Sequence, residues 1–147
     1  MSQCTEHAKT LYLEKGYCCS ESIWLAFAKK YQLEPDLTDA GNRLAFSFCG
    51  GGGSAKLCGA LAGGMLVLGQ HFGRNPDQPR NPDLTKYTKE LFTAFEQQYH
   101  KHDCSDLKPV AQPEVAKQVC AGYLVFVVQK LEEMLDRDYP LPEEVCP

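Results

Sequence analysis

The sequence LCGALAGGMLVL, residues 57–68, is the longest apolar stretch of the chain. It is apolar over about 12 residues, which suits a buried helix and falls short of the roughly 20 residues that a bilayer span needs. Glycine costs a helix about 1 kcal/mol relative to alanine, so we expect these glycines where another backbone or a cofactor comes close. We predict a buried helix that starts at residue 54 or 55, ends near Gly73, and binds a cofactor at Gly59 and Gly63.

Helical periodicity continues on both sides of this stretch, and no segment shows the alternation typical of a strand. Gly16, the run Gly50–Gly53 and the polar, proline-bearing segment 73–82 read as breaks between helices. The predicted helices cover about residues 5–15, 20–31, 37–48, 54–73, 84–100 and 114–137. We therefore predict an all-α fold, a single-domain helical bundle of five or six helices. The domain spans residues 1–147, with a core over about 5–137 and a tail over 138–147.

The spacing of apolar residues also predicts which helix faces are buried. In the third predicted helix the expected face contains Ala40, Leu44, Ala45 and Phe48. In the last predicted helix the expected face contains Val115, Val119, Tyr123, Val127, Leu131 and Leu135.

Charge and composition narrow the partners and the compartment. The net charge is −4, and no Lys/Arg-rich stripe appears, so nucleic-acid binding is not expected. The first 16 residues carry no apolar core of a secretory signal, which predicts a cytoplasmic location and makes persistent disulfides improbable. No membrane span is expected. A redox partner cannot be identified from the sequence, and homodimerisation stays open.

Cysteine is the most informative residue type, because it combines soft metal ligation with reversible redox chemistry. The chain has eight: Cys4, Cys18, Cys19, Cys49, Cys58, Cys104, Cys120 and Cys146. Cys18 and Cys19 precede the second predicted helix and Cys58 lies in the first turn of the fourth, where helix N–H groups stabilise a thiolate. Cys104 follows the fifth helix and Cys120 lies in the last, so four segments could each direct one sulfur to a common centre. No CxxC pair occurs, which gives no support to a zinc ribbon or a thioredoxin-type site.

Four segments together carry a more specific pattern. They are GYCCSESIWLAF (16–27), GGGGSAKLCGALAGGMLVLG (50–69), HDCSDL (102–107) and VCAGYLVFVV (119–128). The chain resembles the C-GCAxxG-C-C family of redox-active proteins over about residues 5–135, and CGALAG at 58–63 matches the family's CGAxxG motif. The resemblance implies that Cys19, Cys58, Cys104 and Cys120 are the family's four cysteines. Cys19 is preferred to Cys18 because the family pattern places its cysteine directly before a helix.

Three functions are compatible with this set of residues. In the first, Cys19, Cys58, Cys104 and Cys120 bind a metal centre for electron transfer or sensing, most simply an iron–sulfur cluster, with zinc as another possibility. In the second, no metal binds and Cys19 or Cys58 acts as a low-pKa thiolate in a thiol–disulfide oxidoreductase or redox sensor. The third is a helical binding domain with inert cysteines. His100 and His102 are the first substitute ligands near Cys104, and whether the chain is an enzyme is left undecided.

Overall fold

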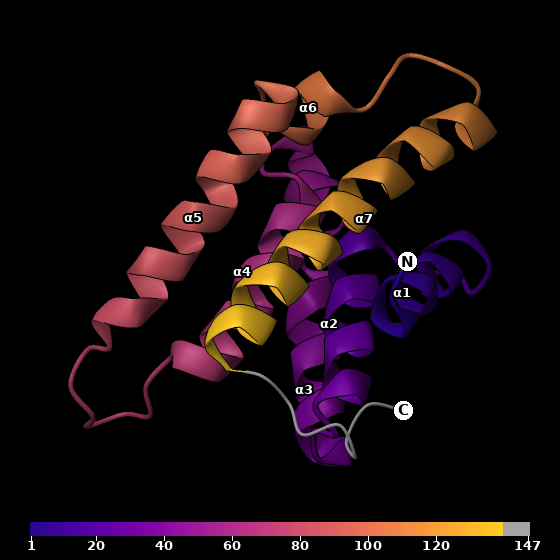
Figure 1. Ribbon diagram of the computed structural model, residues 1–147. Helices are drawn as coiled ribbons and strands as arrows, with labels where there is room; N and C mark the ends of the chain where they lie inside the picture. The colour runs from indigo at the N-terminus through magenta and orange to yellow at the C-terminus, as the bar shows by residue number, and fades with distance from the viewer. Residues whose placement is uncertain (140–147) are drawn as a thin grey trace.

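The computed structural model describes residues 1–139, and nearly every segment in that range is helical (Figure 1). The helices are α1 (Gln3–Leu13), α2 (Cys19–Lys30), α3 (Pro35–Phe46), α4 (Gly59–Phe72), α5 (Pro82–Tyr99), α6 (Cys104–Leu107) and α7 (Pro113–Asp138), with a π-helical turn η1 (Gly51–Ala55) before α4. No strand occurs within residues 1–139, so the predicted all-α class is confirmed. The six predicted helices are present, and the short α6 is additional. The predicted tail lies outside the described residues from 140 onward, as does Cys146.

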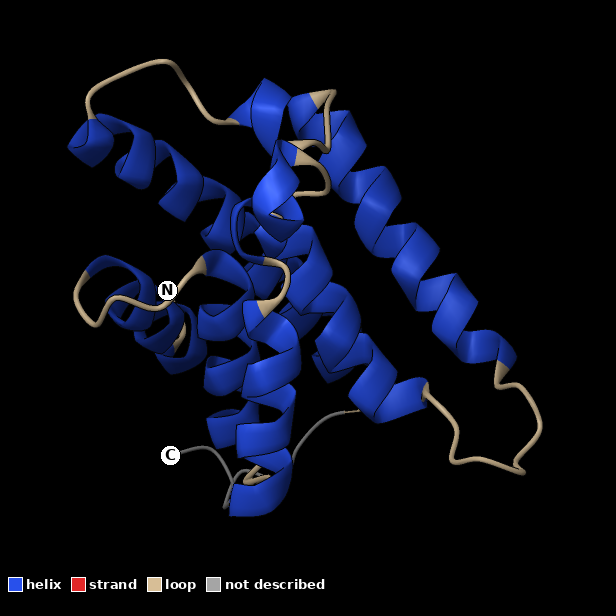
Figure 2. Ribbon diagram, turned by 180° about the vertical axis from the view of Figure 1, so that it is seen from behind, coloured by secondary structure: helices blue, strands red, loops and turns tan. Residues whose placement is uncertain are grey.

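Helix α4 is the centre of the bundle, packed against α2, α3, α5 and α7 (Figures 1 and 2). Its small residues let those neighbours come close. A Cβ at Gly63 would lie 2.9 Å from the Cα of Ser20 and 3.2 Å from the Cβ of Ile23, both in α2. On another side, a Cβ at Gly64 would meet Leu91 and Val127. The glycines therefore serve helix packing along most of α4. No helix in the described part of the chain is both long and apolar enough to cross a membrane.

The predicted start of α4 is wrong by about one helical turn. Gly50 to Gly53 all have positive φ, between 62° and 69°, and Ala55 also has a positive φ of 53°. An α-helix cannot run through consecutive left-handed residues, so the chain forms the η1 turn instead, and α4 begins only at Gly59. Cys58 is consequently the N-cap of α4 and not a residue of its first turn.

Two of the predicted buried faces also need correction. In α3, Leu44 is 61% exposed. Phe48 lies beyond the end of α3 and is only half-buried. Gly41 and Ala45 form the contact face instead, because a Cβ at Gly41 would strike the Trp24 ring. In α7, the first turns bury Ala116, and two predicted core residues are exposed: Val115 and Val119. In both helices the smaller residues face the core, which apolar periodicity alone does not indicate.

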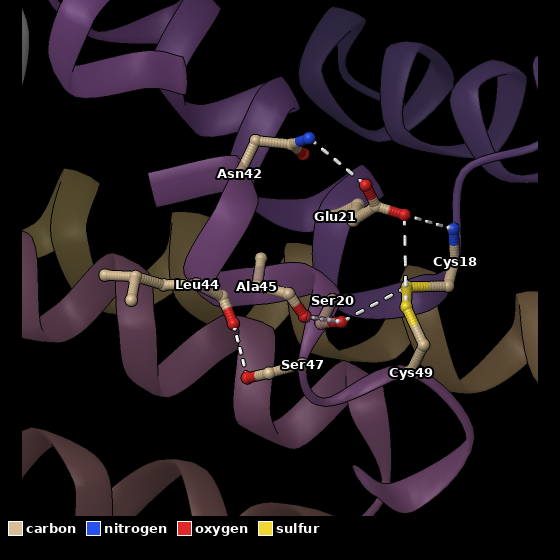
Figure 3. The surroundings of a disulfide bond; sticks show 8 residues. All are labelled: Cys18, Ser20, Glu21, Asn42, Leu44, Ala45, Ser47 and Cys49. Carbon is tan, nitrogen blue, oxygen red and sulfur yellow. Dashed lines mark hydrogen bonds between the residues drawn. A yellow bond between two sulfur atoms is a disulfide. The ribbon is translucent and has the colours of Figure 1, made fainter. Parts of the chain in front are cut away.

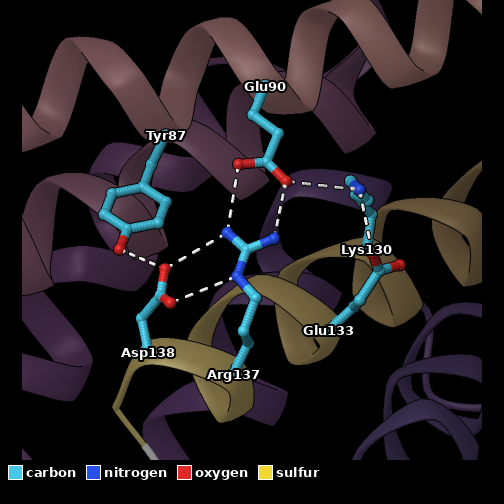
Figure 4. A network of polar contacts seen from close by, with 6 residues as sticks. All are labelled: Tyr87, Glu90, Lys130, Glu133, Arg137 and Asp138. Carbon is cyan, nitrogen blue, oxygen red and sulfur yellow. Dashed lines mark hydrogen bonds and ion pairs between the residues drawn. The ribbon is translucent and has the colours of Figure 1, made fainter.

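Arg137, near the C-terminal end of α7, forms a network of hydrogen bonds and ion pairs with α5 (Figure 4). Its guanidinium donates two hydrogen bonds to Glu90, both 3.2 Å, and also contacts Asp138. Tyr87 donates its hydroxyl hydrogen to Asp138 at 2.5 Å, and Lys130 pairs with Glu90 at 3.5 Å. The hydrogen bonds from Arg137 are the main reason that the pKa of Glu90 and the pKa of Asp138 both lie below their usual values.

We expect this network to make stability depend on pH. A carboxylate whose folded pKa is depressed stabilises the fold above its unfolded pKa, and that contribution is lost as pH falls through the folded pKa. Arg137→Gln should therefore lower the melting temperature at pH 7, and the gap to the wild type should close below about pH 4. Circular-dichroism melts at pH 7 and pH 3 check this expectation. An equal gap at both pH values would contradict it.

Candidate functional site

Six of the cysteines line one cavity of about 490 Å³: Cys18, Cys19, Cys49, Cys58, Cys104 and Cys120. The cavity lies among the starts of α2, α4 and α6, the C-terminal part of α1 and the N-terminal half of α7, and the loop between α6 and α7 forms part of its wall. Tyr12, Tyr123, Gly51 and Gly59 also line it. The structure thus brings Cys19, Cys58, Cys104 and Cys120, the four cysteines that the resemblance singles out, to a single place. Cys4 is buried elsewhere, in a separate cavity between α1, α2 and α7.

Backbone pairing between two distant segments positions Cys58 beside Cys104. Leu57 and Asp103 form an isolated antiparallel bridge. Next to it, the Cys58 N–H donates to the carbonyl of His102 at 2.8 Å, and the Cys104 N–H donates to the carbonyl of Lys56 at 2.6 Å. These bonds fix both cysteine backbones at the cavity, one at the start of α4 and the other at the start of α6. Nothing in the local sequence indicates this pairing, because the two segments lie far apart in the chain.

Cys58 is the N-cap of α4, and its side chain makes no capping hydrogen bond. The nearby backbone N–H groups of Ala60 and Leu61 act to lower the pKa of the Cys58 thiol. Burial nevertheless raises the pKa of the Cys58 thiol, and the nearby thiol of Cys104 adds to the rise. Burial therefore outweighs the two N–H donors at this position.

Tyr12, Cys19 and Cys120 line the cavity together. Burial is the main cause that raises the pKa of Tyr12, and the thiols of Cys19 and Cys120 add to the rise. Burial also raises the pKa of Cys19 to about 12, with further contributions from Cys58 and Cys120. The pKa of Cys120 is raised by burial and then by Cys104. The four thiols thus lie near one another at the cavity.

The surroundings of Cys19 and Cys58 in the metal-free chain therefore oppose the predicted low-pKa thiolate. Both thiols sit at a helix N-terminus, as predicted, but the surrounding apolar wall disfavours a lone negative charge more than the helix favours it. Neutral thiols at pH 7 are poor nucleophiles. A bound cation would reverse this balance, since a metal-coordinating thiol is deprotonated outright.

Cys18 and Cys49 form a disulfide at the rim of the same cavity (Figure 3). The prediction that disulfides are improbable is thus wrong for this pair. The buried Glu21 lies beside it: its Oε1 accepts the Cys18 N–H at 3.3 Å and is 3.9 Å from the Cys49 Sγ. The only three ligand atoms within residues 1–139 that all lie within 4.8 Å of one another belong to Cys18, Glu21 and Cys49. Because Cys18 is paired, Cys19 is the cysteine of this dipeptide with a free thiol.

Of the remaining predicted site residues, one lines the cavity and the others lie outside its lining. Gly59 lines the cavity, and a Cβ there would come within 3.4 Å of the Cys19 Cβ. Gly63 packs against α2, as described above, so close helix packing accounts for its lack of a side chain. His102 is half-exposed and pairs with Glu96 at 3.3 Å. His100 is the C-cap of α5. Neither histidine lines the cavity.

Comparison with known proteins places the chain in a family that is defined by its cysteines. The family described as "Putative redox-active protein (C_GCAxxG_C_C)" matches residues 17–134, a range that covers most of the chain and includes Cys19, Cys58, Cys104 and Cys120. No curated protein and no solved structure matches the chain. The chain belongs to the C_GCAxxG_C_C family of redox-active proteins.

Proposed function

We propose that Cys19, Cys58, Cys104 and Cys120 bind an iron–sulfur cluster that serves electron transfer or redox sensing. The observation that carries this proposal is the convergence of these four cysteines, from four separate helices, on one cavity of about 490 Å³. Four cysteine thiolates are the usual ligand set of [2Fe–2S] and [4Fe–4S] clusters. Such a cluster supplies one-electron chemistry when it is bound.

The spacing of the sulfurs favours a cluster over a single zinc ion. A tetrahedral zinc with Zn–S bonds of about 2.3 Å draws its sulfurs to within roughly 3.8 Å of one another. Among the described residues, no three of these four sulfurs lie within 4.8 Å of one another. A cluster of several irons keeps the sulfurs of its cysteine ligands farther apart than one ion does. The observed separation of the four sulfurs therefore fits a cluster better than a single zinc ion, which would have to draw them together.

The residues around the cysteines suit the same role. The backbone N–H groups of Ala60 and Leu61 lie near the Cys58 sulfur and act to lower the pKa of its thiol, and Tyr12 lines the cavity together with Cys19 and Cys120. Hydrogen bonds to the sulfurs are among the main determinants of a cluster's reduction potential. The apolar, largely buried surroundings of Cys19 and Cys58 would limit access of water to that side of the site.

Reconstitution of the metal-free chain tests the proposal against zinc. One sample receives ferrous iron and sulfide without oxygen, and a matched sample receives zinc alone. We expect the first to gain a broad visible absorption and to bind iron and sulfide in near-equal amounts, because a cluster needs both. Stoichiometric zinc binding at the four cysteines together with no uptake of iron and sulfide would contradict the proposal.

The existence of a redox partner and the formation of a homodimer stay predictions.

Tyr12→Phe should alter the cluster without releasing it. The hydroxyl can donate to a ligand sulfur, and such a bond stabilises the more negative, reduced form. Its loss is expected to lower the reduction potential by roughly 20–60 mV, which corresponds to one ordinary hydrogen bond, while iron content stays at the wild-type level. A redox titration of the visible absorption measures the shift. An unchanged potential would show that Tyr12 does not contact the centre.

A further inference from the structure

A second redox site lies at the same cavity, in residues that the four-cysteine centre does not use. The disulfide between Cys18 and Cys49 joins the N-cap of α2 to the segment that follows α3. We propose that these two cysteines are an exchange-active pair, which alternates between disulfide and dithiol through reaction with an external thiol. The proposal does not depend on a metal at the other four cysteines.

Access to the sulfurs is the first requirement, because thiol–disulfide exchange begins when a thiolate approaches a disulfide sulfur. Cys18 and Cys49 are only half-buried, and both line the cavity. The residues that follow Cys49 are glycines, and no heavy atom lies within 4 Å of the position that a Cβ would take at Gly50. The space beside Gly50, directly after Cys49, is therefore open.

The surroundings also satisfy the reduced form of the pair (Figure 3). Oε1 of Glu21 lies 3.9 Å from the Cys49 Sγ, and Oγ of Ser20 lies 3.4 Å from the Cys18 Sγ. Ser20 gives its own hydrogen to the carbonyl of Ala45 at 2.7 Å, which leaves its oxygen able to accept one. A thiol at either cysteine thus has an acceptor already in place. A disulfide has no hydrogen to donate, so these acceptors suit the dithiol form.

The chemistry balances with a dithiol as the reductant. One of its thiolates attacks a sulfur of the Cys18–Cys49 bond, which breaks as a mixed disulfide forms. The second thiol of the reductant then attacks the mixed disulfide and leaves as part of an oxidised, disulfide-bonded product. Two electrons pass from the dithiol to the pair, and the two protons of the dithiol end on Cys18 and Cys49. Two glutathione molecules can replace the dithiol in the same sequence.

A redox titration of the folded, full-length protein tests the proposal. The protein is equilibrated without oxygen in buffers of reduced and oxidised glutathione, and free thiols are then labelled and located by mass spectrometry. We expect labelling of Cys18 and Cys49 to rise together from about a tenth to about nine tenths over a roughly hundredfold change in [GSH]²/[GSSG]. The same samples are analysed for iron, and the expected result holds whatever the iron content.

Three variants make the assignment specific. In Cys49→Ala, Cys18 has lost its partner and should accumulate a glutathione adduct, and Cys18→Ala should trap the adduct on Cys49. Cys4→Ala, which alters a cysteine outside this cavity, should leave the wild-type titration unchanged. If a variant fails to fold, the wild-type titration alone decides. A pair that stays oxidised across all glutathione ratios in the folded protein, or a disulfide that forms between other cysteines, would overturn the proposal.

Discussion

Cys58→Ser is expected to lower the iron content of the purified protein at least tenfold. Loss of a hydrogen bond to a metal ligand commonly lowers metal affinity 10–100-fold. Loss of the ligand itself should lower metal affinity at least as much. The fold should survive the change, because serine is a favourable N-cap residue. Its oxygen can accept a backbone N–H group in the first turn of α4, where the Cys58 side chain makes no capping hydrogen bond. Metal analysis and a circular-dichroism melt of the same sample measure both effects.

The matched control for this variant is Cys4→Ala. Cys4 is also a buried cysteine, but it lies in the separate cavity lined by Lys30 and Glu132. Iron content should therefore stay at the wild-type level. Equal iron in Cys58→Ser and the wild type would rule out Cys58 as a ligand. Equal loss in both variants would show that iron content reports general destabilisation and not ligation.

Gly63→Ala is expected to destabilise the fold by about 1–3 kcal/mol, the usual cost of overpacking a core. The added Cβ would lie 2.9 Å from the Cα and 3.0 Å from the carbonyl oxygen of Ser20. Both atoms belong to the backbone of α2, so they cannot move aside as a flexible side chain can. Ser20 follows Cys19 directly, so displacement of α2 should also shift Cys19 relative to the other cysteines of the cavity. Urea unfolding measures the change in the free energy of unfolding.

Gly69→Ala is the matched control in the same helix. No atom lies within 4 Å of the position that a Cβ would occupy at Gly69, so the substitution brings only the better helix propensity of alanine, up to about 1 kcal/mol. A lower free energy of unfolding in Gly63→Ala together with a higher one in Gly69→Ala would show why residue 63 is glycine. The reason would be the close approach of α2 and α4, and not helix propensity. A neutral or stabilising Gly63→Ala would refute the packing explanation.

Much of this architecture could be predicted from the sequence because it depends on local signals. Apolar periodicity and glycine or proline breaks located the six longer helices. The order of the cysteines along the chain, together with the family motif, singled out four of the six cysteines that line one cavity. The prediction of the helices succeeded because a helix forms from contacts between residues that are close in the sequence.

The remaining features depend on long-range or strained geometry that periodicity does not encode. The left-handed residues Gly50–Gly53 moved the start of α4 to Gly59. The bridge between Leu57 and Asp103 joins segments with no shared local pattern. The disulfide between Cys18 and Cys49 was missed because eight cysteines allow 105 pairings. The raised pKa of Cys19 follows from burial by distant elements, which a view of its helix terminus alone does not reveal.

The most direct test of the four-cysteine centre is iron and acid-labile sulfide analysis of protein purified without oxygen. A [2Fe–2S] or [4Fe–4S] cluster predicts near-equal iron and sulfide, about two or four of each per chain, together with visible absorption. Protein that contains neither, with free thiols at Cys19, Cys58, Cys104 and Cys120, would contradict the assignment. The redox chemistry of the family would then have to be sought at the thiols themselves, first at Cys18 and Cys49.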